Sequence, residues 1–279
     1  MSLNISSKQI ANPLLVSLLA KLSETFECIG SEFYVIGATA RDILIRILAQ
    51  SPDQRRTRDL DIAIAVPDWN RYGEIQEWLV CSGFRKSKYY RQRFYYGEYE
   101  VDVVPFGAIV KDDYIIWPPD EDIAMSVKGF NEALDRPINV CIDDSFDIKV
   151  VSLQGLFVLK LNAWLDRNLQ SNKDAEDLWC IIDNYYYANE HRGIYPEVYD
   201  IENFDLSVAG AYWLAKDLCQ ILAKDTINYF RNVIMAEIEN DGGGRLVMQM
   251  VETGRGLYPA DVIRSLRIIA GVFSAFVDA

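Results

Sequence analysis

Two aspartates, Asp59 and Asp61, carry the clearest chemical signal in this sequence. The apolar, alternating run that follows them to Val66 is typical of a β-strand, and the period of a strand places both carboxylates on one face. Two like charges so placed repel each other. A hard divalent cation prefers oxygen ligands and would turn this repulsion into coordination. The spacing therefore predicts a metal site.

The segment before this pair has the pattern of a phosphate-binding turn. An apolar strand over residues 33–36 precedes Gly37, Ala38 and Thr39, and a helix with apolar residues at 43, 44 and 47 follows. Small residues let backbone amides at a helix N-terminus approach a phosphate, and the helix dipole favours negative charge there. We expect this turn to contact phosphate groups.

A third acid, Asp102, lies in another predicted strand, residues 99–107. It can supply the third carboxylate of the metal site. The structural alternative makes Asp59 a strand-start cap tied to Arg58 or Arg41, and makes Asp102 the buried partner of an arginine. Because three acids on one sheet have no obvious fixed cation beside them, we favour the metal interpretation.

Two cations interrupt the apolar face of a helix predicted to follow Ser152. Lys160 and Arg167 lie among apolar residues at helical spacing, and a buried ammonium requires an anion. The next predicted helix begins with Asp174 and Asp177, which supply matching carboxylates. Two interpretations stay open: the helical pair presents Lys160 to a nucleotide phosphate, or salt bridges only hold the two helices together.

The order of these elements resembles the minimal nucleotidyltransferase fold of the DNA polymerase β superfamily. That order is a strand, a small-residue turn, a helix, a strand that begins with Asp-x-Asp, and a later strand with a single aspartate. Further segments are similar to the bacterial nucleotidyltransferase family grouped with the AbiEii/AbiGii toxins, namely residues 117–120, 125–133, 160–167 and 173–178. The resemblance runs from about residue 30 to residue 187. It implies an α/β (α+β) fold, with a mixed sheet, flanking helices and a helical C-terminal part.

The resemblance also implies a reaction and a site. A nucleoside monophosphate would move from a nucleoside triphosphate to an acceptor hydroxyl, with two Mg²⁺ ions, replaceable by Mn²⁺, held by Asp59, Asp61 and Asp102. Lys160 and Asp174 match a lysine and an aspartate of the family's nucleotide site. The other positions that match nucleotide-binding residues are Gly37, Ala38, Thr39, Arg41, Arg167, Lys173 and Asp177.

One position departs from the superfamily pattern. The turn usually contains Gly-Gly or Gly-Ser, whereas this chain has Gly37-Ala38, which lacks the hydroxyl that often contacts a phosphate; Thr39 offers a substitute. A second function therefore stays open, a catalytically silent nucleotide-binding or interaction module that retains the fold. If the protein is an enzyme, its acceptor stays open and is an RNA such as tRNA, a protein hydroxyl or a small molecule. If it is a toxin, its partner would be an antitoxin protein.

The composition of the 279-residue chain indicates a globular protein, since 50% of the residues are hydrophobic. No apolar run reaches the roughly 18 residues that span a membrane, and five cysteines without a Cys-x-x-Cys pair fit reduced thiols. We expect a cytoplasmic protein without a membrane partner. The pattern turns helical near residue 151, which predicts a nucleotidyltransferase-like α/β domain over 1–151 and a helical domain over 152–279 that completes the nucleotide cleft.

Charge is unevenly distributed along the chain. The net charge of −13 argues against non-specific attraction to nucleic acid. Residues 85–96 are an exception, with five basic residues, interleaved aromatics and no acid. This segment either contacts a triphosphate or polynucleotide, or forms a solvated hairpin whose aromatics face the core. We favour the hairpin, because alternating aromatics are ordinary in strands.

Overall fold

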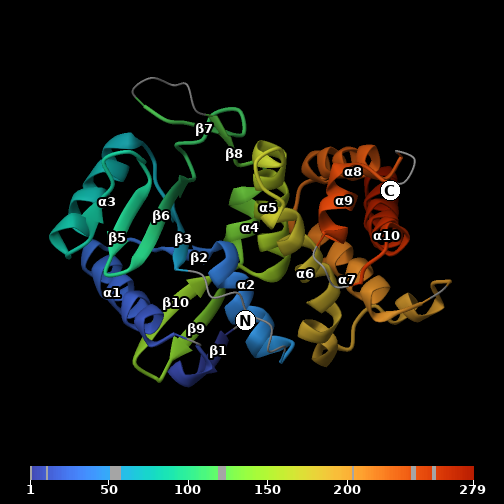
Figure 1. The fold of residues 1–279 in the computed structure, drawn as a ribbon, viewed down its shortest axis with the longest axis horizontal. Coiled ribbons are helices and arrows are strands. Elements are labelled where there is room, and N and C mark those ends of the chain that lie inside the picture. Colours follow the sequence, from blue (N-terminus) through green and yellow to red (C-terminus); the bar gives the residue numbers. More distant parts are fainter. Residues whose placement is uncertain are drawn as a thin grey trace. The chain divides into compact units, whose positions relative to one another are not determined.

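The structure, a computed structural model, describes residues 2–10, 12–50, 58–118, 124–202, 204–239, 243–252 and 256–279 (Figure 1). The chain divides into two compact units. Unit 1 comprises residues 1–47 and 52–152, and unit 2 comprises residues 48–51 and 153–279. Pro119 and Asp120, which belong to one segment of the family resemblance, lie outside the described residues.

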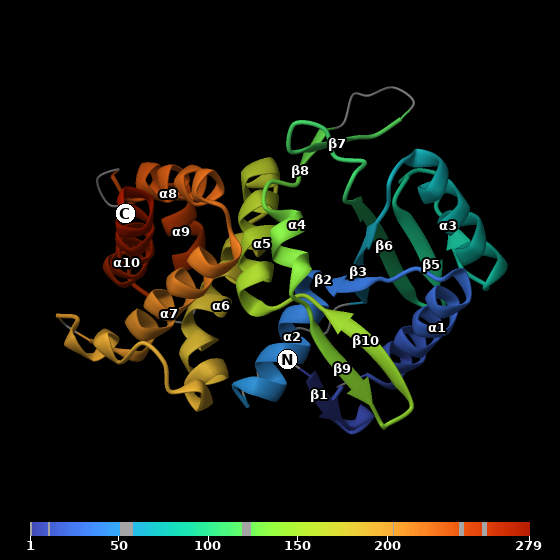
Figure 2. The same cartoon turned by 180° about the vertical axis from the view of Figure 1, so that it is seen from behind.

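Unit 1 is built around an eight-stranded mixed sheet with the order β1-β9-β10-β2-β3-β6-β5-β4 (Figures 1 and 2). Its strands are β1 (Ser2–Ile5), β2 (Tyr34–Ile36), β3 (Asp59–Ala65), β4 (Arg85–Lys86), β5 (Arg93–Tyr96), β6 (Tyr99–Phe106), β9 (Ile138–Ile142) and β10 (Phe146–Val150). Three neighbouring pairs are parallel: β1–β9, β10–β2 and β3–β6. A separate two-stranded sheet joins β7 (Tyr114–Ile116) to β8 (Ala124–Ser126). The predicted α/β class with a mixed sheet is confirmed.

Unit 1 contains five described helical segments, and α1 has clear capping signals at both ends. They are α1 (Pro13–Ile29), α2 (Gly37–Leu48), α3 (Trp69–Cys81), α4 (Phe130–Asp135) and the 3-10 turn η1 (Ser7–Gln9). The side chain of Asn12 accepts a hydrogen bond from the amide of Leu14 at 3.0 Å, and Pro13 occupies the first turn of α1. Gly30 ends α1 at a φ of 60°, a left-handed conformation that favours glycine. Asn12 and Pro13 together fix the start of this helix.

Strand β6 explains how the sheet separates a core face from a polar face. Tyr99, Val101 and Val103 are buried, and the residues between them, including Asp102, are partly exposed. This two-residue alternation is the signature of a strand with one face on the core. The acidic residues of β3 and β6 therefore lie on the face that is not covered by the core.

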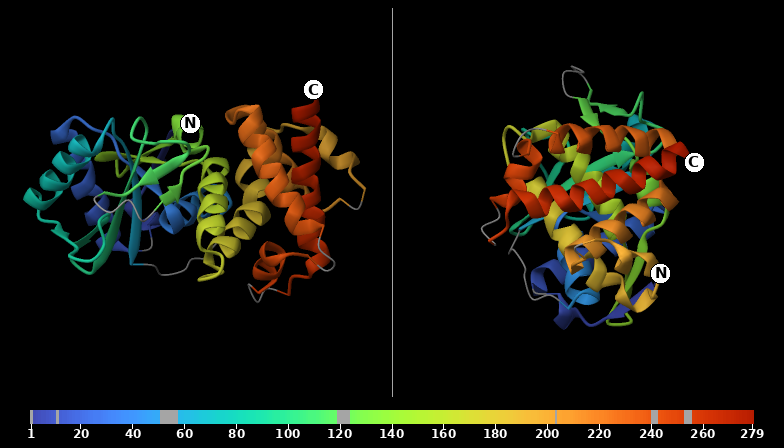
Figure 3. Two further views of the ribbon diagram at one scale, coloured as in Figure 1. Left: turned by 90° about the horizontal axis from the view of Figure 1, so that it is seen from above. Right: turned by 90° about the vertical axis from the view of Figure 1, so that its right-hand side faces the viewer.

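Unit 2 is entirely helical within its described residues. Its helices are α5 (Leu153–Arg167), α6 (Lys173–Asn189), α7 (Leu206–Ile221), α8 (Lys224–Ile238), α9 (Arg245–Val251) and α10 (Pro259–Asp278), with 3-10 turns η2 (Glu190–Arg192) and η3 (Pro196–Asp200). Figure 3 shows the C-terminal helix α10 running beside α8, with which it packs. Helices α6 and α7 approach so closely that a Cβ at Gly210 would lie 2.2 Å from the carbonyl oxygen of Ile182. None of the described helices of either unit is long and apolar enough to cross a membrane.

Candidate active site

Four carboxylates lie on one face of two adjacent strands in unit 1. Strands β3 and β6 run parallel in a register that pairs Asp59 with Glu100 and Asp61 with Asp102. Residues paired across neighbouring strands project from the same face, and the strands are about 4.8 Å apart. The sheet therefore brings the two aspartates of the Asp-x-Asp pair beside Asp102, and adds a fourth acid, Glu100.

Gly37 brings the start of α2 against this acidic row. Its φ is +67°, and a Cβ built on it would lie 2.1 Å from Oδ2 of Asp61. No residue with a side chain fits that distance without displacing the carboxylate. Ile36, the preceding residue, pairs with Asp61 across β2 and β3. The register of the sheet thus fixes how closely the turn approaches Asp61.

Thr39 and Arg41, both predicted to bind nucleotide, are buried near the start of α2. The Thr39 hydroxyl donates to the backbone carbonyl of Asp59 at 3.3 Å, which ties the turn to β3. The Arg41 guanidinium forms a buried ion pair with Asp42, and its Nε donates to Oδ1 of that residue at 2.8 Å. Thr39 therefore ties the turn to β3, and Ala38 lies between Gly37 and Thr39 in the same turn.

Arg93 is the residue of this site that the sequence analysis missed. Its guanidinium donates two hydrogen bonds of 2.8 Å to the Asp102 carboxylate and lies 2.5 Å from Oε2 of Glu100. The hydrogen bonds to Asp102 raise the pKa of Arg93 further above its already high value. The assumption that no fixed cation lies beside the three acids is wrong, because Arg93 pairs with Asp102 across β5 and β6.

A sequence signal for this pairing exists in the turn between β5 and β6. Gly97 has a φ of +57° and, with Glu98, forms a two-residue connection that sets Tyr96 opposite Tyr99. Counting outward from that pair along an antiparallel hairpin places Arg93 opposite Asp102. The register of this short hairpin therefore predicts the contact between Arg93 and Asp102.

The donor set of this face has the chemistry that Mg²⁺ prefers. Asp59, Asp61 and Glu100 offer carboxylate oxygens on one face, and Asp102 offers two more that are bonded to Arg93. Among the described residues, no group of three or more His, Cys, Asp or Glu side chains is gathered closely enough to hold a metal ion. Coordination by Asp102 would require this carboxylate to exchange its arginine partner for the ion.

A second charged cluster lies between α5 and α6 in unit 2. The Lys160 ammonium is 8% exposed and lies 2.6 Å from Oδ2 of Asp177 and 3.1 Å from Oδ1 of Asp174. Arg167 donates two hydrogen bonds to Asp174, at 2.6 and 2.9 Å. Two buried carboxylates are therefore matched by two cations, whereas Lys173, at the start of α6, is exposed and outside this cluster.

The electrostatics of this cluster favour the ionised form of Asp174. Burial by itself raises the pKa of Asp174, but the hydrogen bonds and charges of Arg167 and Lys160 outweigh it and hold that pKa below its usual value. The structure thus brings together Lys160, Arg167, Asp174 and Asp177, as expected for a helical hairpin. A nucleotide-binding role for these residues stays a prediction.

The basic segment 85–96 forms β4, a loop and β5. Phe94 is buried, as expected of an aromatic that faces the core, but Tyr89 is 88% exposed and Tyr90 is also exposed. The expectation that its aromatics face the core is therefore wrong for these two tyrosines. Tyr90 covers Arg93, with the guanidinium carbon 4.9 Å from the ring centre.

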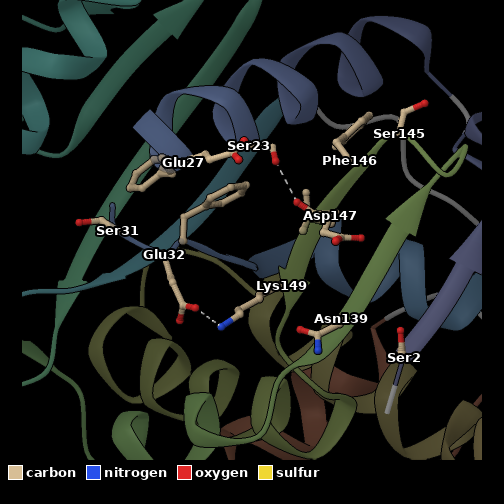
Figure 4. Close-up of a pocket in the computed structure, with 13 residues that line it drawn as sticks. Ser2, Ser23, Glu27, Ser31, Glu32, Asn139, Ser145, Phe146, Asp147 and Lys149 are labelled. Carbon is tan, nitrogen blue, oxygen red and sulfur yellow. Dashed lines mark hydrogen bonds and ion pairs between the residues drawn. The ribbon is translucent and has the colours of Figure 1, made fainter. Parts of the chain in front are cut away.

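A polar pocket of about 650 Å³ lies elsewhere in unit 1, between α1 and the β9–β10 hairpin (Figure 4). Its walls include an ion pair between Glu32 and Lys149 and a hydrogen bond of 3.0 Å from the Ser23 hydroxyl to the carbonyl of Asp147. None of the predicted site residues lines this pocket. It is therefore distinct from the acidic face of β3 and β6.

An Asp-x-Asp strand beside a glycine turn and a third strand aspartate defines the class of this protein, a nucleotidyltransferase. Two solved structures of ANT(2″)-Ia are similar to the chain. The crystal structure in complex with adenylyl-2″-tobramycin is 14% identical, with 71% of this chain and 97% of that chain covered and a TM-score of 0.37. The solution structure of this antibiotic-resistance factor is 15% identical, with 80% and 92% covered and a TM-score of 0.35.

The family follows from the sequence. Residues 27–202 match a family described as nucleotidyl transferase AbiEii toxin, type IV toxin–antitoxin system. The match spans more than half of the chain, so the chain belongs to this family. The resemblance to the AbiEii group is confirmed. No curated protein matches the chain.

Proposed function

We propose that this nucleotidyltransferase is Mg²⁺-dependent and transfers a nucleoside monophosphate from a nucleoside triphosphate to an acceptor hydroxyl. The observation that carries the proposal is the row of acids on β3 and β6, with the turn at Gly37 close against Asp61. Carboxylate oxygens on one face are ligands that Mg²⁺ prefers, and a triphosphate would bring its Mg²⁺ ions to them.

The proposal gives the site residues of unit 1 separate tasks in this reaction. Asp59 and Asp61 would hold the ions, and Asp102 would join them after releasing Arg93. The bound ions would neutralise the triphosphate charge and polarise the α-phosphate. The backbone amides of Gly37, Ala38 and Thr39 would orient a phosphate at the start of α2.

The chemical step is an in-line displacement at the α-phosphorus. The acceptor oxygen forms a bond to this phosphorus, the bond to the bridging β-phosphate oxygen breaks, and pyrophosphate leaves. The hydroxyl proton would pass to a carboxylate, and we propose Asp102, which pairs with Asp61 across β3 and β6, as its acceptor. Arg93, once released from Asp102, offers a cation for the phosphates.

A role as the toxin of a toxin–antitoxin pair follows from the family, whose description names a type IV system. We propose an antitoxin protein as a partner. The acceptor class, whether RNA, protein or small molecule, is decided by experiment, because fold and site do not name it.

The second candidate is a nucleotide-binding module without transfer activity. Two observations favour it: Ala38 lacks the hydroxyl of the usual turn, and the Asp102 carboxylate is already bonded to Arg93. A module of this kind would bind a triphosphate and release no pyrophosphate.

One experiment separates these functions. The protein is incubated with Mg²⁺ and each α-³²P nucleoside triphosphate in turn, together with total RNA and protein from a cell extract, and the labelled fraction and released pyrophosphate are measured. Transfer predicts label in one fraction with an equal amount of pyrophosphate, and none with an Asp61→Asn control. Triphosphate binding without label or pyrophosphate would overturn the enzymatic proposal and support the silent module.

A further inference from the structure

A second pocket of unit 1 combines positive charge with aromatic rings. It has a volume of about 440 Å³ and lies between α3, the loop after β4 and the segment after β7. Three of the residues lining it are basic, Lys86, Lys88 and Arg91, and none of the described residues that line it is acidic. In a chain with a net charge of −13, such a pocket selects an anion.

Among the residues that the structure describes, no carboxylate pairs with two of these cations. Lys86 donates to the Gln76 side-chain oxygen at 2.6 Å, and within the described residues neither Lys86 nor Lys88 forms an ion pair. Arg91 donates to the carbonyl of Trp117 at 2.8 Å, which directs its guanidinium to the same pocket. The positive charge of the two lysines is therefore available to a ligand.

The same pocket has aromatic walls. Trp69, Tyr72 and Trp117 pack together, with ring centres 5.3 to 5.9 Å apart. Tyr89 is 88% exposed at the pocket, a high value for a tyrosine. Flat bases stack on exposed aromatic rings, and a volume of this size suits a small ligand.

The loop that carries Lys88 and Tyr89 has a defined conformation. The Ser87 hydroxyl accepts hydrogen bonds of 3.2 Å from the amides of Tyr89 and Tyr90. The Ser87 amide donates to the carbonyl of Arg93 at 2.8 Å, which closes the loop. A loop fixed in this way loses less conformational freedom when it binds a ligand.

The sheet separates this pocket from the acidic face. Lys86 pairs with Phe94, and Phe94 pairs with Val101, so these three residues share one face of the sheet. Arg93 and Asp102 form the adjacent pair and project from the other face. Because Gln76 of α3 contacts Lys86, the pocket and α3 lie on the face opposite Asp102.

We propose that this pocket is a second nucleotide site, which binds one base with its 5′-phosphate and requires no metal ion. The lysines bind the phosphate, and Trp69 and Tyr89 offer stacking faces to the base. An inorganic anion would contact only the lysines, and an uncharged aromatic compound would contact only the rings, whereas a nucleotide contacts both. The ligand is either a free nucleotide or the 5′-phosphorylated end of an oligonucleotide, which share this chemistry.

The test is calorimetric titration of the full chain in EDTA, so that metal-dependent triphosphate binding at β3 and β6 does not contribute. Adenosine 5′-monophosphate should bind at least about tenfold more tightly than adenosine or inorganic phosphate. Lys88→Glu and Tyr89→Ala should each weaken this binding about tenfold, since both side chains are exposed and neither change disturbs the core. Lys8→Glu and Tyr258→Ala, at exposed positions outside the pocket, are the matched controls.

Two further titrations complete the design. The first uses a 5′-phosphorylated pentanucleotide. If it binds about tenfold more tightly than the mononucleotide and the same variants weaken it, the ligand is an oligonucleotide end. If the two affinities are equal, the ligand is the free nucleotide. Asp61→Asn should bind adenosine 5′-monophosphate as the parent does, which keeps this site separable from the proposed transfer reaction. Binding no tighter than that of adenosine, or binding that both pocket variants leave unchanged, would overturn the proposal.

Discussion

Replacing Lys160 with methionine removes the ammonium that bridges two buried carboxylates between α5 and α6. Asp177 is 2% exposed and would lose a partner at 2.6 Å, whereas Asp174 would keep its two hydrogen bonds from Arg167. Removing one member of a buried ion pair costs about 3 to 5 kcal/mol. Because Arg167 still holds Asp174, we expect the lower end, a decrease of about 3 kcal/mol in the free energy of unfolding of unit 2.

Urea unfolding measures this decrease, with hydrogen exchange of α5 and α6 peptides to assign it to unit 2. With an m-value of about 2 kcal/mol/M, the midpoint should fall by about 1.5 M. Arg167→Met is the first control, since this side chain is 52% exposed and should contribute about 1 kcal/mol or less. Lys160→Met combined with Asp177→Asn is the second control, and should recover most of the loss because it removes one charge of each sign.

The result that refutes this reasoning is a Lys160→Met protein whose midpoint lies within about 0.3 M of the parent. If that protein also binds triphosphate less tightly, the ammonium acts on the nucleotide and not on the helices. Lost stability with unchanged triphosphate affinity in the folded protein would establish the salt-bridge interpretation. The two interpretations that the sequence leaves open are thus separated by one pair of measurements.

Three further predictions follow, two on the acidic face of β3 and β6 and one on the pH dependence of Asp174 in the α5–α6 cluster. Gly37→Ala should lower the unfolding free energy by about 1 to 3 kcal/mol more than Gly30→Ala, because both have positive φ but only at Gly37 does a Cβ meet Asp61; equal losses in urea unfolding would contradict this. Asp61→Asn should abolish nucleotide transfer, because the amide removes one negative charge from the metal site; transfer at the parental rate would show that Asp61 holds no metal. The pKa of Asp174 is held below 3.8, so its carboxylate stabilises the fold above pH 3.8, and this stabilisation is lost as the pH falls through the lower folded-state pKa. The stability deficit of Asp174→Asn at pH 7 should therefore shrink in that acid range, and a deficit that does not change with pH would exclude this linkage.

Local signals in the sequence predict most of the elements that carry the site. The Asn12 cap and Pro13 set the start of α1, and the alternation after Asp61 sets β3, because each depends on residues a few positions apart. The same holds for Lys160 and Asp174, whose helical spacing predicts the face on which they meet. Short-range periodicity is sufficient for these elements, because each is set by residues a few positions apart.

The features that the sequence analysis missed depend on how strands pair with one another, which the pattern within a single strand does not show. Strand β1 has four residues and no distinctive pattern, and it exists because it pairs with β9 more than 130 residues later. Arg93 lies only nine residues from Asp102, but their contact follows from a hairpin register rather than from spacing along one element. Strands β4, β7 and β8 have two or three residues each, too few to show a period.

The pairing of β1 with β9 also bears on how unit 1 forms during translation. Ser2 pairs with Asn139, and β10 then inserts between β9 and β2 by pairing Val150 with Val35. Until residue 150 has left the ribosome, the edge of β2 that β10 later covers is open to other strands. Nascent chains shorter than this hold Asp59, Asp61 and Asp102 on an incomplete sheet. The strands that carry the acidic face pair with each other and with β2, so a ribosome stalled before this point would carry these acids on a sheet whose β2 edge is uncovered.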